Sequence, residues 1–339
     1  MVSFTFSCSN QNDTKNSYDF TERLKIHHSK ELILSKDFLI PQAICIYDSV
    51  IIIEDKNQGF FFHAYNLNTG NKYADFGNSG VGPGDFNMPT TMFVDKNKSE
   101  LVVLDQNRSQ ISYYKIKDII NNNFNNFHQD QINQNASRII QQNDSVLYCL
   151  GLFSEGMIRK DIRGKTIGYD LNYPEIPNEK LTPVEKFLLF QGEIMMKPDK
   201  SKFVYISTRC DLLKIIAIEK DSLKEIITLN TYFPKFKKEP SGIAISRENA
   251  LGFTSIATTD KYIYALFSGR DMVQYPENFY FSDYIYVIDW NGNLIKKIIL
   301  DKDAWKMCID EESKKLYTIH FEMEKYDSNV QFFVYDDVL

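Results

Sequence analysis

The stretch QAICIYDSVIIIEDKNQGFFFHAYNLNTGNKYADF, residues 42–76, is the most informative part of this chain for the fold. It contains four short runs rich in β-branched and aromatic residues, at residues 42–46, 49–54, 60–66 and 72–76. Turn-forming residues separate the runs, namely Asp48, residues 57–59 (Asn-Gln-Gly) and residues 68–70 (Asn-Thr-Gly). The stretch therefore predicts four antiparallel strands connected by short turns.

Similar groups of runs recur along nearly the whole chain. Their first runs begin near residues 42, 91, 137, 193, 255 and 305, which gives spacings of 49, 46, 56, 62 and 50 residues. A repeat of about 40 to 50 residues with four strands in each unit is typical of β-propellers. We predict an all-β, six-bladed β-propeller of four-stranded antiparallel blades, formed by residues 21–339 as a single domain.

The sixth group supplies only three runs, at residues 305–309, 315–320 and 331–335. The strand-like segment at residues 22–34 is expected to provide the missing fourth strand and so to close the ring. The longer spacings are expected to be filled by a helix over residues 182–190, with Thr182 as its cap and Pro183 in its first turn, and by the long segment 269–283.

The composition excludes several classes of function. The formal net charge is −6 and basic residues occur in runs no longer than a pair, so a nucleic-acid partner is not expected. The five cysteines are scattered without metal-ligand spacing, and HExxH and GxSxG motifs are missing from the sequence. We therefore predict no cofactor, no metal and no catalytic residue.

The N-terminal residues 1–20 are interpreted as a tether or the remnant of a signal. Ser7 and Cys8, followed by the polar residues 9–17, resemble the end of a bacterial lipoprotein signal, in which the cysteine is lipidated. Cys8 is therefore the predicted lipidation site and the only expected contact with a membrane. The alternative is an unmodified N-terminus.

Two segments carry a family resemblance. Residues 76–89 (FGNSGVGPGDFNMP), with the strands that follow at residues 92–95 and 101–108, resemble an NHL repeat, in which Gly80, Gly82 and Gly84 are expected to adopt positive φ. Residues 267–270, 285–293, 300–301 and 309–317 are similar to the TolB-like six-bladed propeller proteins of Bacteroidetes. This resemblance implies a lipoprotein or secreted protein of the cell envelope, in the periplasm or at the outer membrane, and it implies no specific activity.

The candidate ligand site lies in the loops after the second strands of the blades. An arginine occurs there in three blades, and an aspartate occurs in or beside the same loops; the six residues are Arg108, Arg209, Arg270, Asp105, Asp211 and Asp271. If the loops converge at one mouth of the ring, the guanidinium groups can bind an anionic group. The alternative is that the arginine–aspartate pairs connect neighbouring blades. Tyr275, Tyr280 and Trp290 are further candidates for ligand contact.

Two functions remain open at this stage. The first is a non-enzymatic binding protein, expected to be a monomer, that holds a protein or glycan ligand in the envelope. The second is a metal-dependent hydrolase or lyase of the gluconolactonase-like propeller type, acting on a sugar-like acid or lactone, with Glu193 and Asp303 as the acidic residues near inner strands.

Overall fold

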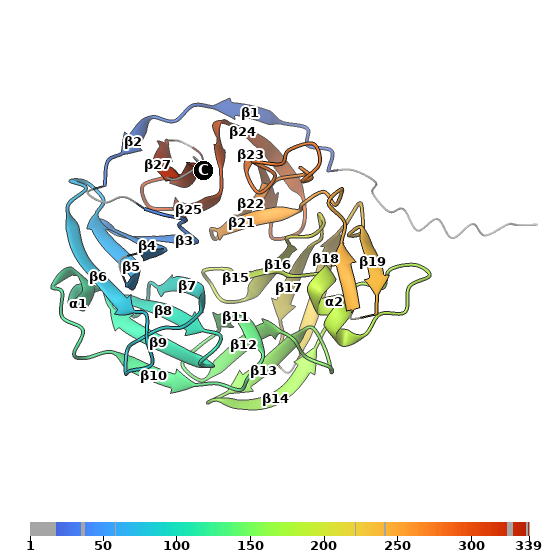
Figure 1. Ribbon diagram of the computed structural model, residues 1–339, viewed down its shortest axis with the longest axis horizontal. Helices are drawn as coiled ribbons and strands as arrows, with labels where there is room; N and C mark the ends of the chain where they lie inside the picture. Colours follow the sequence, from blue (N-terminus) through green and yellow to red (C-terminus); the bar gives the residue numbers. More distant parts are fainter. Residues whose placement is uncertain are drawn as a thin grey trace, which may run out of the picture.

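Six sheets are arranged around a common centre, as the computed structural model shows (Figure 1). It describes residues 18–34, 38–57, 59–220, 222–240, 242–323, 328–336 and 338. Cys8 and most of the predicted tether lie outside these residues. The predicted six-bladed, all-β propeller is confirmed.

Blades 1 to 4 each follow the chain order from the inner to the outer strand. Blade 1 comprises β3 (Ala43–Tyr47), β4 (Val50–Asn57), β5 (Phe60–Asn66) and β6 (Lys72–Asn78). Blade 2 comprises β7 (Pro89–Asp95), β8 (Glu100–Asp105), β9 (Gln110–Lys115) and β10 (His128–Gln131). Blade 3 comprises β11 (Ala136–Gln141), β12 (Val146–Gly151), β13 (Ile158–Ile162) and β14 (Lys165–Asp170). Blade 4 comprises β15 (Gly192–Met196), β16 (Lys202–Ser207), β17 (Leu213–Ile218) and β18 (Leu223–Leu229).

Blades 5 and 6 share the N-terminal segment. Blade 5 comprises β21 (Phe253–Thr258), β22 (Tyr262–Phe267), β23 (Ser282–Asp289), β24 (Leu294–Ala304) and an added fifth strand, β1 (Arg23–Ile26). Blade 6 comprises β25 (Lys306–Asp310), β26 (Lys315–Met323), β27 (Ser328–Tyr335) and β2 (Lys30–Leu32). β2 pairs antiparallel with β27, so the N-terminal segment closes the ring as predicted. β1 instead pairs parallel with β24, so the single strand predicted at residues 22–34 is two strands in two blades.

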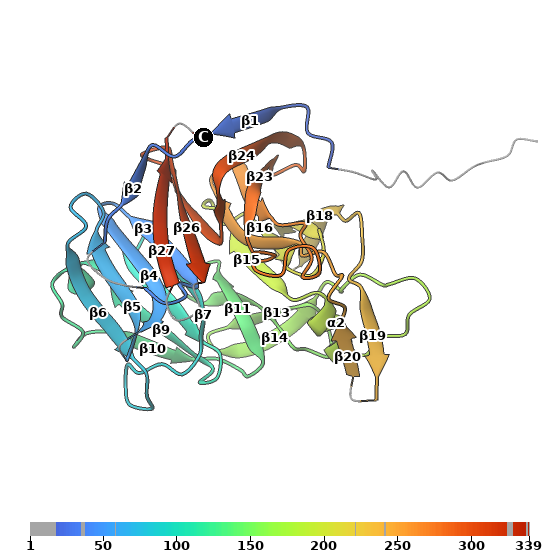
Figure 2. The ribbon, with the colours of Figure 1, turned by 45° about the horizontal axis from the view of Figure 1, so that its top comes forward.

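Two helices and one hairpin lie outside the six blade sheets. Helix α1 (Ile116–Ile120) precedes β10, and helix α2 (Pro183–Leu189) precedes blade 4. The Thr182 cap of α2 is confirmed, because its hydroxyl accepts the Glu185 N–H in a capping box. The hairpin β19 (Phe236–Glu239) and β20 (Gly242–Ile245) projects from the ring (Figure 2) and fills the 62-residue interval. The segment 269–283 lies in the next interval, which spans only 50 residues, so the prediction that this segment fills one of the longer spacings is wrong.

The core lies between the blades. Six clusters of buried apolar side chains occur among the described residues, one at each interface between neighbouring blades. The inner strands contact one another in the order β3, β7, β11, β15, β21, β25 and back to β3. Tyr18 and Phe20, which the sequence places at the end of the tether, pack on Tyr286 of blade 5, with Phe20 buried.

The crossing from blade 1 to blade 2 corrects one expectation. Gly84 has a φ of 77°, but Gly80 and Gly82 are not in the positive-φ region. Asp85 explains why these two positions are glycines, because its carboxylate accepts the Gly82 N–H at 2.7 Å and lies within 3 Å of where a Cβ of either residue would be. Phe86 is buried between the two blades, as the sequence suggests.

Candidate functional site

The loop face is the face of the ring that carries the connections between second and third strands. In an antiparallel blade the first strand starts, and the fourth strand ends, on the same face as these connections. The crossings from one blade to the next therefore lie on the loop face as well. All six predicted site residues are in or next to second-to-third-strand connections, in blades 2, 4 and 5.

In blade 2, Asp105 and Arg108 hold the backbone of the preceding crossing. The buried Asp105 carboxylate accepts the N–H groups of Asn87, Met88 and Arg108 at 2.6, 3.2 and 3.1 Å. The Arg108 guanidinium donates to the carbonyl oxygens of Asp85 at 2.7 Å and Gly82 at 3.1 Å. Both side chains thus connect their loop with the crossing from blade 1.

In blade 4, the two predicted residues differ in their partners. The buried Asp211 carboxylate accepts the backbone N–H groups of Thr231 and Tyr232, which follow β18. Arg209 is half-buried, and its Nε has no hydrogen-bond partner among the described residues. This Nε is itself buried from solvent, so any ligand contact of Arg209 is expected from its Nη atoms.

In blade 5, Arg270 is held by acidic partners. Its Nη1 and Nη2 donate to the two carboxylate oxygens of Asp303 at 2.5 and 2.9 Å, and the guanidinium carbon lies 5.5 Å from the centre of the Tyr275 ring. Asp271 accepts the N–H groups of Val273 and Gln274 and so shapes the long connection after β22. Asp303 is one of the two acids considered for a metal, and its carboxylate is engaged by this pair.

The segment after β20 connects two of the three loops. The Asn249 amide donates to the carbonyl oxygen of Arg209 at 2.9 Å, and the Leu251 N–H donates to the carbonyl oxygen of Arg270 at 2.9 Å. Arg209 and Arg270 therefore lie beside one shared segment, whereas Arg108 bonds to the crossing before blade 2. The six-residue ligand site stays a prediction.

Large apolar side chains are exposed around the loop face. We call this set the apolar rim; it consists of Leu39, Ile40, Val81, Met88, Val273, Tyr275 and Tyr280. Val81 is 91% exposed, and Tyr275 and Tyr280 are each 43% exposed. Trp290, the third candidate aromatic residue, is instead buried and donates to the carbonyl oxygen of Thr259.

Four charged residues lie around the ring centre, and the sequence interpretation missed them as a group. We call Glu54, Arg138, Glu193 and Lys306 the central cluster. Arg138, Glu193 and Lys306 come from the inner strands of blades 3, 4 and 6, and Glu54 lies in the second strand of blade 1, opposite Ala43. Arg138 Nε and Nη2 donate to the Glu193 carboxylate at 2.5 and 2.8 Å, so both oxygens of this second candidate metal ligand are engaged.

The pKa values of the central cluster show that its members interact. Burial raises the pKa of the Glu54 carboxyl to about 8, although Arg138 and Lys306 oppose the rise. Burial lowers the pKa of Lys306, while Glu193 and Glu54 act in the opposite direction. For Glu193, burial would raise the pKa, but Arg138 outweighs it and the pKa is lowered. Because these residues come from blades on different sides of the ring, the electrostatic interactions extend across its centre.

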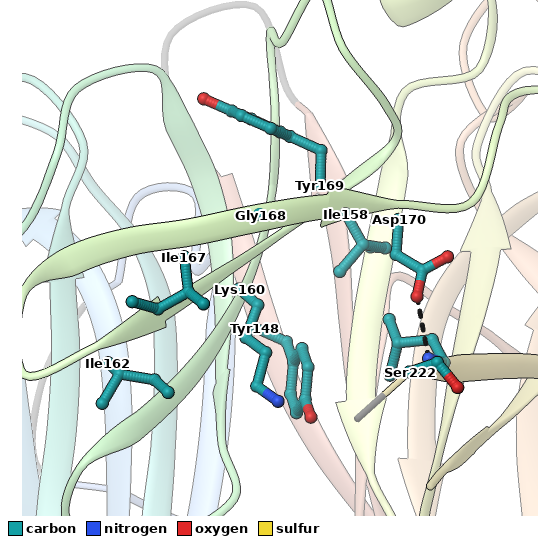
Figure 3. A pocket seen from close by; sticks show the side chains of 10 residues that line it. Tyr148, Ile158, Lys160, Ile162, Ile167, Gly168, Tyr169, Asp170 and Ser222 are labelled. Carbon is teal, nitrogen blue, oxygen red and sulfur yellow. Dashed lines mark hydrogen bonds between the residues drawn. The ribbon is translucent and has the colours of Figure 1, made fainter. Parts of the chain in front are cut away.

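A hollow of about 290 Å³ lies between the outer strands of blade 3 and the start of β18 in blade 4. Figure 3 shows Tyr148 and Lys160 below β14, with the Tyr169 side chain directed away from them. Asp170 closes one end by accepting the Leu223 N–H at 2.8 Å. The residues of this hollow gave no signal in the sequence, because they are ordinary alternating strand residues.

The described residues contain no group of three or more His, Cys, Asp or Glu side chains arranged to hold a metal ion. Within the same residues, no helix has the length and apolar character needed to cross a membrane.

Comparison with known proteins identifies the family. Residues 18–312 match the family of TolB-like six-bladed propeller-like proteins. The chain belongs to this TolB-like family. The sequence-based resemblance to TolB-like propellers is therefore confirmed.

Solved structures share the TolB-like fold of this chain at low sequence identity. A Bacteroides fragilis protein described as exported is 12% identical, with a TM-score of 0.55 and coverage of 92% of this chain and 98% of its own. A member of the DUF4221 family from Bacteroides vulgatus is 12% identical, with a TM-score of 0.57 and coverage of 91% and 96%. No curated protein matches the chain. At such identity the similarity to the two structures concerns the fold alone.

Proposed function

We propose that this protein is a non-enzymatic binding propeller of the bacterial cell envelope, which holds a protein or glycan ligand on its loop face. The observation that carries the proposal is the apolar rim. The rim contains seven of the fourteen exposed large apolar residues of the described chain, and exposed apolar side chains on one face are a feature of interaction sites. Tyrosine supplies much of the contact energy in such sites.

Arg209 supports the same face. Arg209 is half-buried, and no ion pair among the described residues includes it, so its guanidinium charge is available to a carboxylate or a carbonyl of a ligand. The Arg270–Asp303 ion pair restrains the connection between β22 and β23. This connection contains Tyr275 and Tyr280, so their positions are restrained as well. In this proposal Arg209 contacts the ligand, while Arg108, Arg270, Asp105, Asp211 and Asp271 position the loops around it.

The envelope location is supported by the family and by the fold neighbour described as exported. A lipid anchor on Cys8 would place the loop face close to other envelope components. The proposal includes this anchor as the only membrane contact.

The test is retention of an envelope component by the immobilised propeller. The protein is exposed separately to envelope proteins and to envelope glycans, and a retained component is identified, purified and titrated. We expect the double variant Arg209→Ala with Tyr280→Ala to bind it at least about tenfold more weakly than the wild type, since both changes remove side chains that contact the ligand in this proposal.

The matched control is Lys261→Met, which alters an exposed residue in the turn between β21 and β22, on the opposite face. This variant should bind like the wild type. Equal affinity of the double variant and the wild type, with both folded, would exclude the loop face. Failure of the wild type to retain any envelope protein or glycan would refute the binding function.

A further inference from the structure

Six positions around the ring centre are equivalent by strand register. Each is an inner-strand residue paired with the corresponding residue of its second strand: Ala43, Thr91, Arg138, Glu193, Ser255 and Lys306. They lie near the starts of the inner strands, which is the end of the ring at the loop face. Three of the six are charged, and Glu54 is the register partner of Ala43. Blades 1, 3, 4 and 6 thus bring charged groups to one level of the ring.

Arg138 retains hydrogen-bond donors after its contacts are made. Its guanidinium donates twice to Glu193 and once to the Ser137 carbonyl oxygen, at 2.5, 2.8 and 2.7 Å. A guanidinium has five N–H donors, so two remain. The Arg138 and Glu193 side chains are 24% and 25% exposed, which means that solvent reaches this pair. The pair is therefore accessible and electrically neutral, with donors left over.

Lys306 and Glu54 are less fully partnered. Lys306 Nζ donates to the Thr254 carbonyl oxygen at 2.8 Å and lies 4.7 Å from the centre of the Trp305 ring, so one of its three N–H groups is used in a hydrogen bond. Glu54 is buried, with 8% of the residue exposed. Because burial raises the pKa of Glu54 to about 8, this carboxyl is mostly protonated at neutral pH. The cluster then has one uncompensated positive charge, on Lys306, and a carboxylic acid beside it.

We propose that the central cluster binds a carboxylate group of a ligand, with Lys306 and Arg138 donating to it and Glu54 donating its acidic proton. A carboxylate carries one negative charge and so matches the one uncompensated cation, whereas a phosphate carries about two charges and would face Glu193 unfavourably. A partly buried cation has also lost part of its hydration, and pairing with an anion compensates for that loss. The inference rests on the proposed function, because it places the carboxylate of the ligand at the centre of the loop face.

The test uses small acids as probes, in titration calorimetry with the full chain. D-glucuronate represents an acidic sugar and N-acetylglycylglycine a peptide C-terminus; their methyl esters are the neutral counterparts. We expect saturable binding of at least one acid, no binding of its ester, and at least about a tenfold loss of affinity in Lys306→Met. The acid that binds shows which of the two sources supplies the carboxylate. Lys261→Met is the control and should bind the acid like the wild type.

A second measurement needs only the wild type, in case Lys306→Met does not fold. Titrations near about pH 8 in two buffers of different ionisation heat give the protons taken up on binding, and we expect net uptake because a bound carboxylate raises the pKa of Glu54 further. The charged or titratable groups facing Glu54 are Arg138, Lys306, Glu193, Asp55 and Cys45.

Three results would overturn the inference: no binding of either acid by the wild type, equal binding of acid and ester, or binding of the acid without proton uptake. The rim variant Arg209→Ala with Tyr280→Ala separates this test from that of the proposed function. A rim variant that binds the small acid while losing the envelope ligand leaves both proposals standing. A Lys306→Met variant that retains the envelope ligand, in a protein whose wild type binds no acid, refutes the carboxylate site alone.

Discussion

Aspartates at the ends of second strands show how single residues set the loop face. Asp55 accepts the N–H groups of Leu39 and Ile40 at 2.9 Å each, and Asp105 accepts those of Asn87 and Met88. In both blades a buried carboxylate thus accepts backbone N–H groups just before a first strand, where these groups have no partner in a sheet. These aspartates fix the start of the inner strands, and through them the level at which the central cluster lies.

Glu54, next to Asp55, makes the stability of the ring depend on pH. Burial raises its pKa to about 8, whereas a glutamate in an unfolded chain titrates near about 4.3. The folded protein therefore binds more protons between these values, and the stabilising contribution is full below the unfolded pKa and lost as the pH rises through the folded pKa.

We expect the free energy of unfolding of the wild type, relative to Glu54→Gln, to fall by about 3 to 4 kcal/mol between about pH 5 and about pH 8. Urea unfolding of both proteins across this range measures the effect. Glu248→Gln, at an exposed glutamate on the loop after β20, should run parallel to the wild type. Parallel curves for wild type and Glu54→Gln would show that Glu54 is ionised in the folded protein.

At the scale of single elements, local sequence decides where strands and helices form when the local signal is strong. The alternation in blades 1, 3 and 4 predicts all of their strands, and Thr182 with Pro183 predicts α2. β10 gives no such signal, because its sequence HQDQ is polar and mostly exposed. It is a strand because the free edge of β9 is there to pair with, which is a property of the assembled blade.

Helix α2 provides a test at this scale. Thr182→Ala removes the hydroxyl that accepts the Glu185 N–H, and we expect the protein to lose about 1 kcal/mol of stability. Thr182→Ser retains the acceptor and should unfold close to the wild-type urea concentration. If Ala and Ser variants unfold alike, the capping box does not stabilise the ring.

For the whole molecule, stability depends on closure. Each of the six interface clusters contains side chains from two neighbouring blades. If one strand at such an interface is lost, apolar side chains of both blades become exposed. β2 contributes the buried Leu32 to the interface between blades 6 and 1, whereas β1 lies outside β24 as a fifth strand. The two N-terminal strands therefore differ in their importance for closure.

Two truncations compare the N-terminal strands. Removal of residues 1–28 deletes β1 and keeps β2, and we expect a soluble monomer with a lowered melting temperature. Removal of residues 1–35 also deletes β2, exposes the edge of β27, and is expected to give an aggregating chain. Size-exclusion chromatography and light scattering distinguish the two. A soluble monomer with the wild-type melting curve after the longer deletion would show that β2 is not needed for closure.

The sequence by itself determined the number of blades, the closure by the N-terminal segment, α2 and the family, because these follow from periodicity, turn residues and caps, which act over a few residues. Only the tertiary structure decided how β1 and β2 divide between two blades and which side chains engage Arg108, Arg209 and Arg270. It alone also brought Glu54, Arg138, Glu193 and Lys306 to one level of the ring. The physical reason is that side chains tens to hundreds of residues apart meet through strand register and ring closure, which no local pattern in the chain encodes.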